Sequence, residues 1–160
     1  MTEPSRAVLS VRGETRSTVA PDSVVIGCLL SEVRSTKLDA LQSAAATIRG
    51  LTDELRTLGG VPLTVESERH PLTWSVQSPS TYDEPGQYGP TGNIVANVPV
   101  SIIGRDFDQL ADLGAVLAGH EKLTVQNTSW QVDPDNPAWP QVRAAAIDAA
   151  LDSPIDSPPL

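Results

Sequence analysis

Residues 36–60, TKLDALQSAAATIRGLTDELRTLGG, decide the fold because they predict a long amphipathic helix. Thr36 or Ser35 can cap its start, with Asp39 at capping-box spacing from Thr36. Gly59-Gly60 is typical of a left-handed helix end. Apolar residues recur at steps of three and four and form one stripe: Leu38, Leu41, Ala45, Ile48, Leu51, Leu55 and Leu58. We expect this stripe to face a sheet built from the flanking segments.

Two strands are predicted before this helix. Residues 7–19 alternate apolar and polar side chains, with Gly13 marking a bulge or a close backbone approach. A turn at residues 20–23 leads into a second strand, residues 24–33, which is apolar on both faces. Cys28 lies on one face, and the other carries Val25, Leu29 and Val33. Such a strand is covered on both sides or contributes to a subunit contact.

Two long extended segments are predicted after the helix. In residues 63–76 the apolar positions change parity, which requires a bulge, and His70-Pro71 is its natural place. Residues 77–91, rich in proline and glycine, predict a mobile loop that joins a hairpin and serves binding or assembly. Residues 94–102 form a clean strand, and Pro99 places it at an edge or leaves it locally unpaired.

The remaining periodicities complete an α+β order of β-β-α-β-β-α-β-α. Asp106 caps a second helix that reaches Leu117 with Phe107, Leu110, Leu113 and Gly114 facing the core. A strand follows from Leu123 to Val132, with a parity change near Asn127-Thr128, and residues 133–137 start an alanine-rich helix at residues 142–151. We expect a flexible N-terminus at residues 1–6, one domain over residues 7–151 and a disordered tail at residues 152–160.

Composition excludes several functions. The 160 residues suit one domain, and the formal charge of −9 repels phosphate backbones, so we expect no nucleic-acid partner. Because Cys28 is the single cysteine, the chain cannot form an internal disulfide. We interpret Cys28 as a small, buried hydrophobic residue. The sequence has no apolar run of signal-peptide or membrane-span length. We therefore expect a soluble, cytoplasmic protein without a membrane span.

From about residue 8 to residue 151 the chain resembles the SIMPL-domain family of bacterial and animal proteins. The matching pieces are Val11-Arg12-Gly13-Glu14, Val19-Ala20-Pro21-Asp22, Leu58-Gly59, Gly92-Asn93-Ile94-Val95-Ala96-Asn97-Val98, Arg105-Asp106-Phe107 and Val142-Arg143-Ala144-Ala145-Ala146. The resemblance implies a bent antiparallel sheet with helices packed on one face, and a tendency to self-assemble. Bacterial relatives are often periplasmic or envelope-associated, some form large rings, and animal relatives act as signalling adaptors. Relatives usually continue with further strands after the alanine-rich helix, so we expect a C-terminally shortened domain.

The ionisable residues predict no catalytic or metal site, and no cofactor. His70 and His120 have no second histidine or cysteine at ligand spacing. Asp133, Asp135 and Asn136 favour helix capping over calcium binding, because prolines flank them and a bidentate glutamate is missing. Glu66 and Glu68 share a strand face, but no nucleophile accompanies them, and we interpret them as solvated.

The aromatic residues are the better functional candidates. Trp74, Tyr82, Tyr88 and Trp130 lie in extended segments, where aromatics commonly anchor protein contacts. The alternative is that both tryptophans fill the bend of the sheet, which we favour for Trp130. With Val25, Leu29 and Val33, these residues predict a non-enzymatic protein that self-associates or acts as a protein-interaction scaffold. A second hypothesis is a small-ligand binding module that uses the concave sheet face and residues 77–91.

Overall fold

The computed structural model describes residues 13–16 and 18–152, which divide between two compact units. The larger unit is Pro21–Gln131, and the smaller one draws on the two ends of the chain, Met1–Ala20 and Val132–Leu160. The expected flexible segment at residues 1–6 lies outside the described residues, as does the expected tail beyond Asp152. The single domain expected over residues 7–151 stays a prediction.

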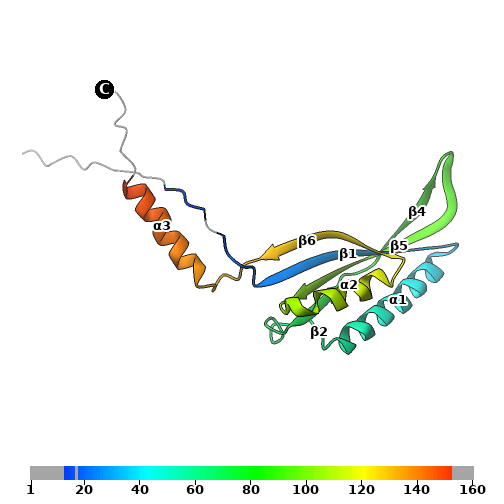
Figure 1. Cartoon of the computed structure of the whole chain (residues 1–160). Helices are drawn as coiled ribbons and strands as arrows, with labels where there is room; N and C mark the ends of the chain where they lie inside the picture. Colours follow the sequence, from blue (N-terminus) through cyan, green and yellow to red (C-terminus); the bar gives the residue numbers. More distant parts are fainter. Residues whose placement is uncertain (1–12, 17, 153–160) are drawn as a thin grey trace, which may run out of the picture. The chain divides into compact units, whose positions relative to one another are not determined.

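The larger unit is a six-stranded sheet with two α-helices, and the α+β class is confirmed (Figure 1). Its strands follow the order β2-β3-β5-β1-β6, and β4 also pairs with β5. The elements are β1 (Ser23–Arg34), α1 (Lys37–Thr57), β2 (Val61–Pro62), β3 (Leu72–Val76), β4 (Ser80–Gly86), β5 (Gly89–Gly104), the 3₁₀ turn η1 (Phe107–Gln109), α2 (Leu110–Ala118) and β6 (Leu123–Gln131). The pairing is antiparallel except between β2 and β3, which are parallel.

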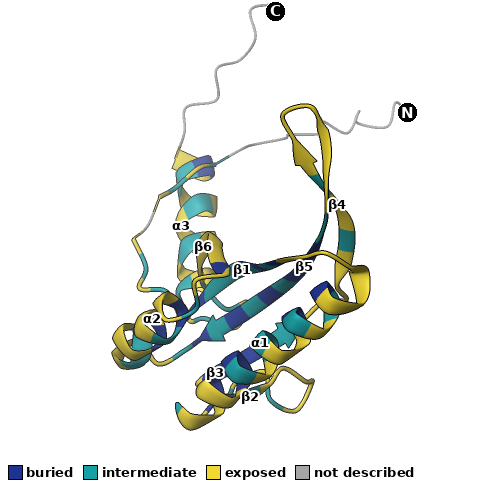
Figure 2. Ribbon diagram, turned by 90° about the vertical axis from the view of Figure 1, so that its right-hand side faces the viewer, coloured by how far each residue is buried: buried dark blue, intermediate teal, exposed yellow. Residues whose placement is uncertain are grey.

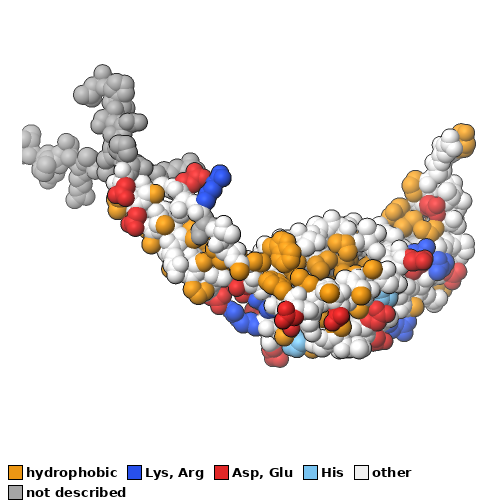
Figure 3. Space-filling view, viewed as in Figure 1, with side chains coloured by type: hydrophobic (Ala, Val, Ile, Leu, Met, Phe, Trp, Pro, Cys, Tyr) orange, Lys and Arg blue, Asp and Glu red, His pale blue; other side chains and the backbone are white. Residues whose placement is uncertain are grey.

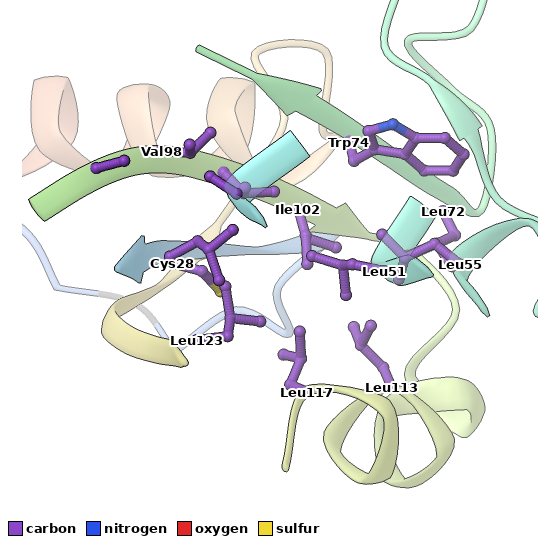
Figure 4. Packing of buried hydrophobic residues seen from close by; sticks show 14 of the residues in the cluster. Cys28, Leu51, Leu55, Leu72, Trp74, Val98, Ile102, Leu113, Leu117 and Leu123 are labelled. Carbon is purple, nitrogen blue, oxygen red and sulfur yellow. The ribbon is translucent and has the colours of Figure 1, made fainter. Parts of the chain in front are cut away.

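The hydrophobic core lies between the sheet and both helices. Alternate residues of β1 and β5, such as Cys28 and Ile102, point toward Leu51 and Leu55 of α1 and Leu113 of α2 (Figure 4). Burial is deepest along these strand positions and on the inner side of α1 (Figure 2). Because both helices contribute to this one cluster, the expected packing of helices on one face is confirmed.

Helix α1 begins and ends where the sequence predicts. The Thr36 hydroxyl accepts a hydrogen bond of 3.1 Å from the Asp39 amide at its start. At its end Gly59 has a φ of +90°, and the Gly60 amide donates to the Leu55 carbonyl at 2.9 Å. This is the Schellman arrangement.

The apolar stripe of α1 is only partly correct. Leu38 is 64% exposed, whereas Ala40 and Ala44 are buried against the sheet. Small alanines let the first half of the helix approach the strands closely, and this turns Leu41 toward the side of the contact. Part of the stripe therefore lies beside the core rather than inside it.

Strand β5 is the centre of the sheet. It pairs with β1 along one side, from Gly104 opposite Val24 to Ile94 opposite Arg34. Its other side is shared by β3, which reaches Val100, and β4, which starts opposite Asn97. The Gln77 amide donates to the Pro99 carbonyl at 3.0 Å, so the Pro99 nitrogen also points to this gap between strands. Pro99 pairs with Leu29 of β1 but has no strand partner on its other side, so the prediction of local unpairing is confirmed for that side only, and β5 is not an edge strand.

The prediction of a long extended segment with a bulge over residues 63–76 is wrong for residues 63–71 and correct for residues 72–76, which form β3. Only β2 and β3 are extended, and a loop of turns connects them. Ser67 holds this loop: its hydroxyl donates to the Pro62 carbonyl at 2.8 Å and accepts from the Thr64 amide at 2.7 Å. Such local side-chain bonds compete with a strand ladder. The parity change is therefore produced by a whole loop, not by a bulge at His70-Pro71.

Two further strand predictions are corrected. The described residues 13–16 and 18–19 form no strand, and residues 7–12 lie outside the described part of the chain. Residues 77–91, predicted as a mobile loop that joins a hairpin, instead contain β4, a tight turn at residues 87–88 and the start of β5. Gly89 has a φ of +121° at that turn, which favours glycine. The proline and glycine residues mark the turn of a hairpin.

Predictions near the end of the chain hold better. Strand β6 has its register shift where Asn127 lies opposite Gly27 and Val125 opposite Cys28, close to the predicted parity change. In the smaller unit α3 (Ala138–Asp152) starts at residue 138 rather than residue 142. Pro140 fits its first turn because the amides there have no helical acceptor. The Asn136 side chain accepts from the Ala138 amide at 2.8 Å, which confirms the predicted helix start.

Candidate interaction surface

The sheet has one face that carries α1 and α2 and an opposite face, called here the open face. In β1 and β5 the open face consists of odd-numbered residues. Val25, Leu29 and Val33 lie on it opposite Ile103, Pro99 and Val95. Val25 and Leu29 are half-buried and Val33 is 38% exposed. The structure therefore brings the three predicted valine and leucine residues onto one surface.

Tyr82 extends the open face into the β4–β5 hairpin. It pairs with Val95, which in turn pairs with Val33 on β1. Directly opposite residues of antiparallel strands point to the same side, so these three side chains share the open face. Tyr82 is 48% exposed. The hairpin turns away from α1, so the open face lies on the inside of this bend (Figure 2).

The open face of β1 and β5 is uncharged. Between its apolar residues lie small or neutral polar ones, and the Ser31 hydroxyl donates to the Asn97 side-chain oxygen at 2.7 Å. Asn127 of β6 lies directly over Gly27, where a β-carbon would collide with its side chain. In the view of Figure 3 charged side chains gather over α1 and α2, and hydrophobic ones gather near β6.

The other aromatic candidates lie elsewhere. Trp74 is 4% exposed and fills the core on the helix side, with the Arg56 guanidinium 5.4 Å from its ring centroid. Tyr88 sits at the hairpin turn and is 96% exposed. Trp130 is 56% exposed and packs edge-to-face on Phe107, with ring centroids 5.6 Å apart. The expectation that Trp130 fills the bend is wrong, and Trp74 is the buried tryptophan.

The ionisable side chains are dispersed. His70 Nδ1 lies 3.1 Å from the Leu72 carbonyl, and His120 Nε2 lies 3.1 Å from a Glu54 carboxylate oxygen. Glu66 and Glu68 are exposed in the loop between β2 and β3. Across residues 13–16 and 18–152 no group of three or more His, Cys, Asp or Glu residues is arranged to hold a metal ion.

Sequence reasoning missed one buried carboxylate, Glu32. It is 3% exposed and lies at the end of the core-facing row of β1. The Thr47 hydroxyl of α1 donates to Glu32 Oε1 at 3.1 Å, and the Arg34 guanidinium lies 3.4 Å from Oε2. The parity that places Cys28 and Leu30 inward also places Glu32 inward, so the signal was present. These contacts join β1 to α1.

Each of the two units contains a cavity. One, on the helix side of the larger unit, has a volume of about 480 Å³ and lies between α1 and the segment that connects β3 to β4. The other, of about 610 Å³, lies within the smaller unit and includes Trp139, whose indole nitrogen donates to the Asp133 carbonyl at 2.8 Å. Within the described residues no helix is long and apolar enough to cross a membrane.

These features define an α+β protein whose helices cover one side of a sheet and leave open a side that is uncharged along β1 and β5. The family model SIMPL, described as a protein of unknown function (DUF541), matches residues 9–153, and the chain belongs to this family. The resemblance inferred from the sequence is thus confirmed. None of the curated proteins compared with the chain matches it.

Proposed function

We propose that the protein is non-enzymatic and associates with copies of itself, or with another protein as a scaffold, through its open face. The observation that carries this proposal is the absence of charge along the open face of β1 and β5 in a chain of net charge −9. Two copies of an acidic protein repel each other. Contact through an uncharged face keeps like charges apart, and burial of its valine, leucine and proline side chains favours association.

The β4–β5 hairpin supports the same proposal. Tyr82 lies on the open face and Tyr88 stands exposed at the hairpin turn. Tyrosine is common among the residues that dominate binding energy, since its ring buries a large area and its hydroxyl keeps a hydrogen bond. We therefore assign Tyr82 and Tyr88, with Val25, Leu29 and Val33, to the contact.

Light scattering with mass determination tests the proposal. At concentrations of about tens of micromolar, in the range of ordinary protein affinities, we expect a mass above that of one chain. Leu29→Lys places a charge on the open face and should shift the mass toward the monomer. Leu38→Lys, at an exposed leucine of α1, is the matched control and should leave the mass unchanged. A strict monomer without a co-purifying partner would contradict the proposal.

A second candidate function is a small-ligand binding module on the concave open face with residues 77–91. The placement of Tyr82 inside the bend favours it. A thermal-shift screen should then show saturable stabilisation by a metabolite, because a ligand that binds only the folded state raises its stability. No hit from a broad panel would count against this function.

A cytoplasmic location is a further part of the proposal. One cysteine, buried and free, is what a reducing compartment allows. Cell fractionation with an antibody against the chain tests it, and recovery from the envelope fraction would contradict it.

A further inference from the structure

The cavity beside α1 arises from a break in the sheet. Strand β3 ends at Val76 and β4 begins at Ser80, so β5 has no strand partner on that side near Val98. The connecting segment carries Pro79, which lines the cavity together with Val76 and Val98. The missing stretch of strand leaves a hollow between α1 and β5.

The helix side of this cavity is the part of the apolar stripe that packs at the margin of the core and is only partly buried. Leu41, Ala45 and Ile48 line the cavity together with the buried Ala44. Leu41 and Ile48 are half-buried and Ala45 is exposed. The cavity is therefore walled almost entirely by carbon, on both its helix and its strand sides.

Arg49 is the charged residue of the lining. Its Nε lies 3.5 Å from the Ala45 carbonyl of its own helix, a weak contact that leaves most of its donors available. Within the described residues no carboxylate lies at ion-pair distance from it, and Asp53, one turn further on, contacts Arg56 at 3.4 Å instead. A guanidinium without a carboxylate partner, beside an apolar hollow, is suited to a carboxylate ligand.

We propose that this cavity binds a linear aliphatic carboxylate, with its tail along Leu41, Ile48 and Val76 and its head group on Arg49. Ligand cavities run from about 300 to 1000 Å³, and the volume here is about 480 Å³. At about 30 Å³ for each carbon unit, the share of a water molecule in the liquid, the cavity has room for about sixteen units, so a ten-carbon acid fits within it. The site lies on the helix side of the sheet and is therefore separate from the open face. The proposal of carboxylate binding can thus be tested independently of self-association.

Titration with decanoate below its micelle concentration, followed by amide chemical shifts of the ¹⁵N-labelled full chain, tests the inference. We expect saturable shifts concentrated at residues 41–49, at residues 76–79 and at Val98. Octanoate should bind more weakly by up to about fourfold for each methylene removed, as burial of a methylene predicts. Decanol, which lacks the charge, should bind more weakly than decanoate. Shifts that do not saturate, or that centre on the open face, would overturn the inference.

Variants separate the head-group contact from the tail contact. Arg49→Gln should lower the affinity for decanoate by about tenfold, the loss expected for a charge-assisted hydrogen bond. It should leave the affinity for decanol unchanged. Arg49→Lys should retain most of the affinity, and Ala45→Phe should abolish binding of both ligands by filling the hollow. Lys37→Gln, in the first turn of the same helix, is the matched control. Full decanoate affinity in Arg49→Gln or in Ala45→Phe would overturn the inference.

Because Arg49 and Ala45 are both exposed, these variants should fold, and their far-ultraviolet circular dichroism checks this. Light scattering on the same samples measures self-association separately.

Discussion

At the scale of single residues, the end of α1 rests on Gly59. Its φ of +90° is a conformation that other residues adopt with strain. Gly59→Ala should lower the free energy of unfolding by about 1 kcal/mol, measured by urea denaturation. The matched control is Gly50→Ala in the middle of the same helix, where a β-carbon meets open space. It should raise stability by about 0.5–1 kcal/mol, so changes of the same sign in both variants would contradict this account.

Cys28 gives the protein a pH dependence in the alkaline range. Burial raises the pKa of its thiol because desolvation disfavours the thiolate. In alkali the unfolded chain therefore loses this proton before the folded chain does, and stability falls as pH rises above the ordinary thiol pKa and through the higher folded one. Cys28→Ala should lose less stability than wild type between about pH 8 and about pH 10, measured by denaturant unfolding. Equal losses in both proteins would sink this prediction.

At the scale of elements, Glu32 and Thr47 join β1 to α1. Thr47→Val removes the hydroxyl that donates to the buried Glu32 carboxylate and keeps the shape of the side chain. Stability should fall by about 1–3 kcal/mol, the cost of a buried polar group that loses its partner. Thr57→Val is the control on the same helix, because its hydroxyl bonds an exposed backbone carbonyl. A similar loss in both variants would mean that the contact contributes nothing specific.

Elements whose hydrophobic pattern repeats over many residues were predictable from the sequence. Elements fixed by local side-chain hydrogen bonds were not. The caps of α1 and the alternation of β5 and β6 follow directly from residue order. The loop after β2 depends on the Ser67 hydroxyl reaching the Pro62 carbonyl, which no hydrophobic pattern records. The parallel pairing of β2 with β3 rests on two residue pairs, Val61 with Thr73 and Pro62 with Trp74, too few to give a period.

The candidate surface was predictable in part. A strand apolar on both faces indicated that Val25, Leu29 and Val33 would share a side, and β1 places them so. That Tyr82 joins them depends on the register of β4 with β5, which the sequence does not fix. The alternation of apolar residues also predicted that Trp74 and Leu72 share one face of the sheet. It did not predict which face the helices cover. The structure answers that through the core between α1 and the sheet.

At the scale of the whole molecule, the core is confined to one part of the chain. Every residue of the hydrophobic cluster lies between Cys28 and Leu123, inside Pro21–Gln131. A chain of residues 21–131 alone should therefore unfold cooperatively, since it keeps all of this burial. Thermal denaturation followed by circular dichroism checks this against the full chain. Loss of a cooperative transition would favour the single domain expected over residues 7–151.

The central place of β5 has a consequence for how the chain reaches its native state. β1 leaves the ribosome early, with apolar side chains on both sides, yet the strands that flank it, β5 and β6, are translated only after α1, β3 and β4. Pairing between strands so far apart in the sequence forms slowly. Until it forms, the unpaired apolar strand is prone to aggregate with other chains. We therefore expect the yield of the protein in a cell to depend on chaperones or on rapid completion of translation.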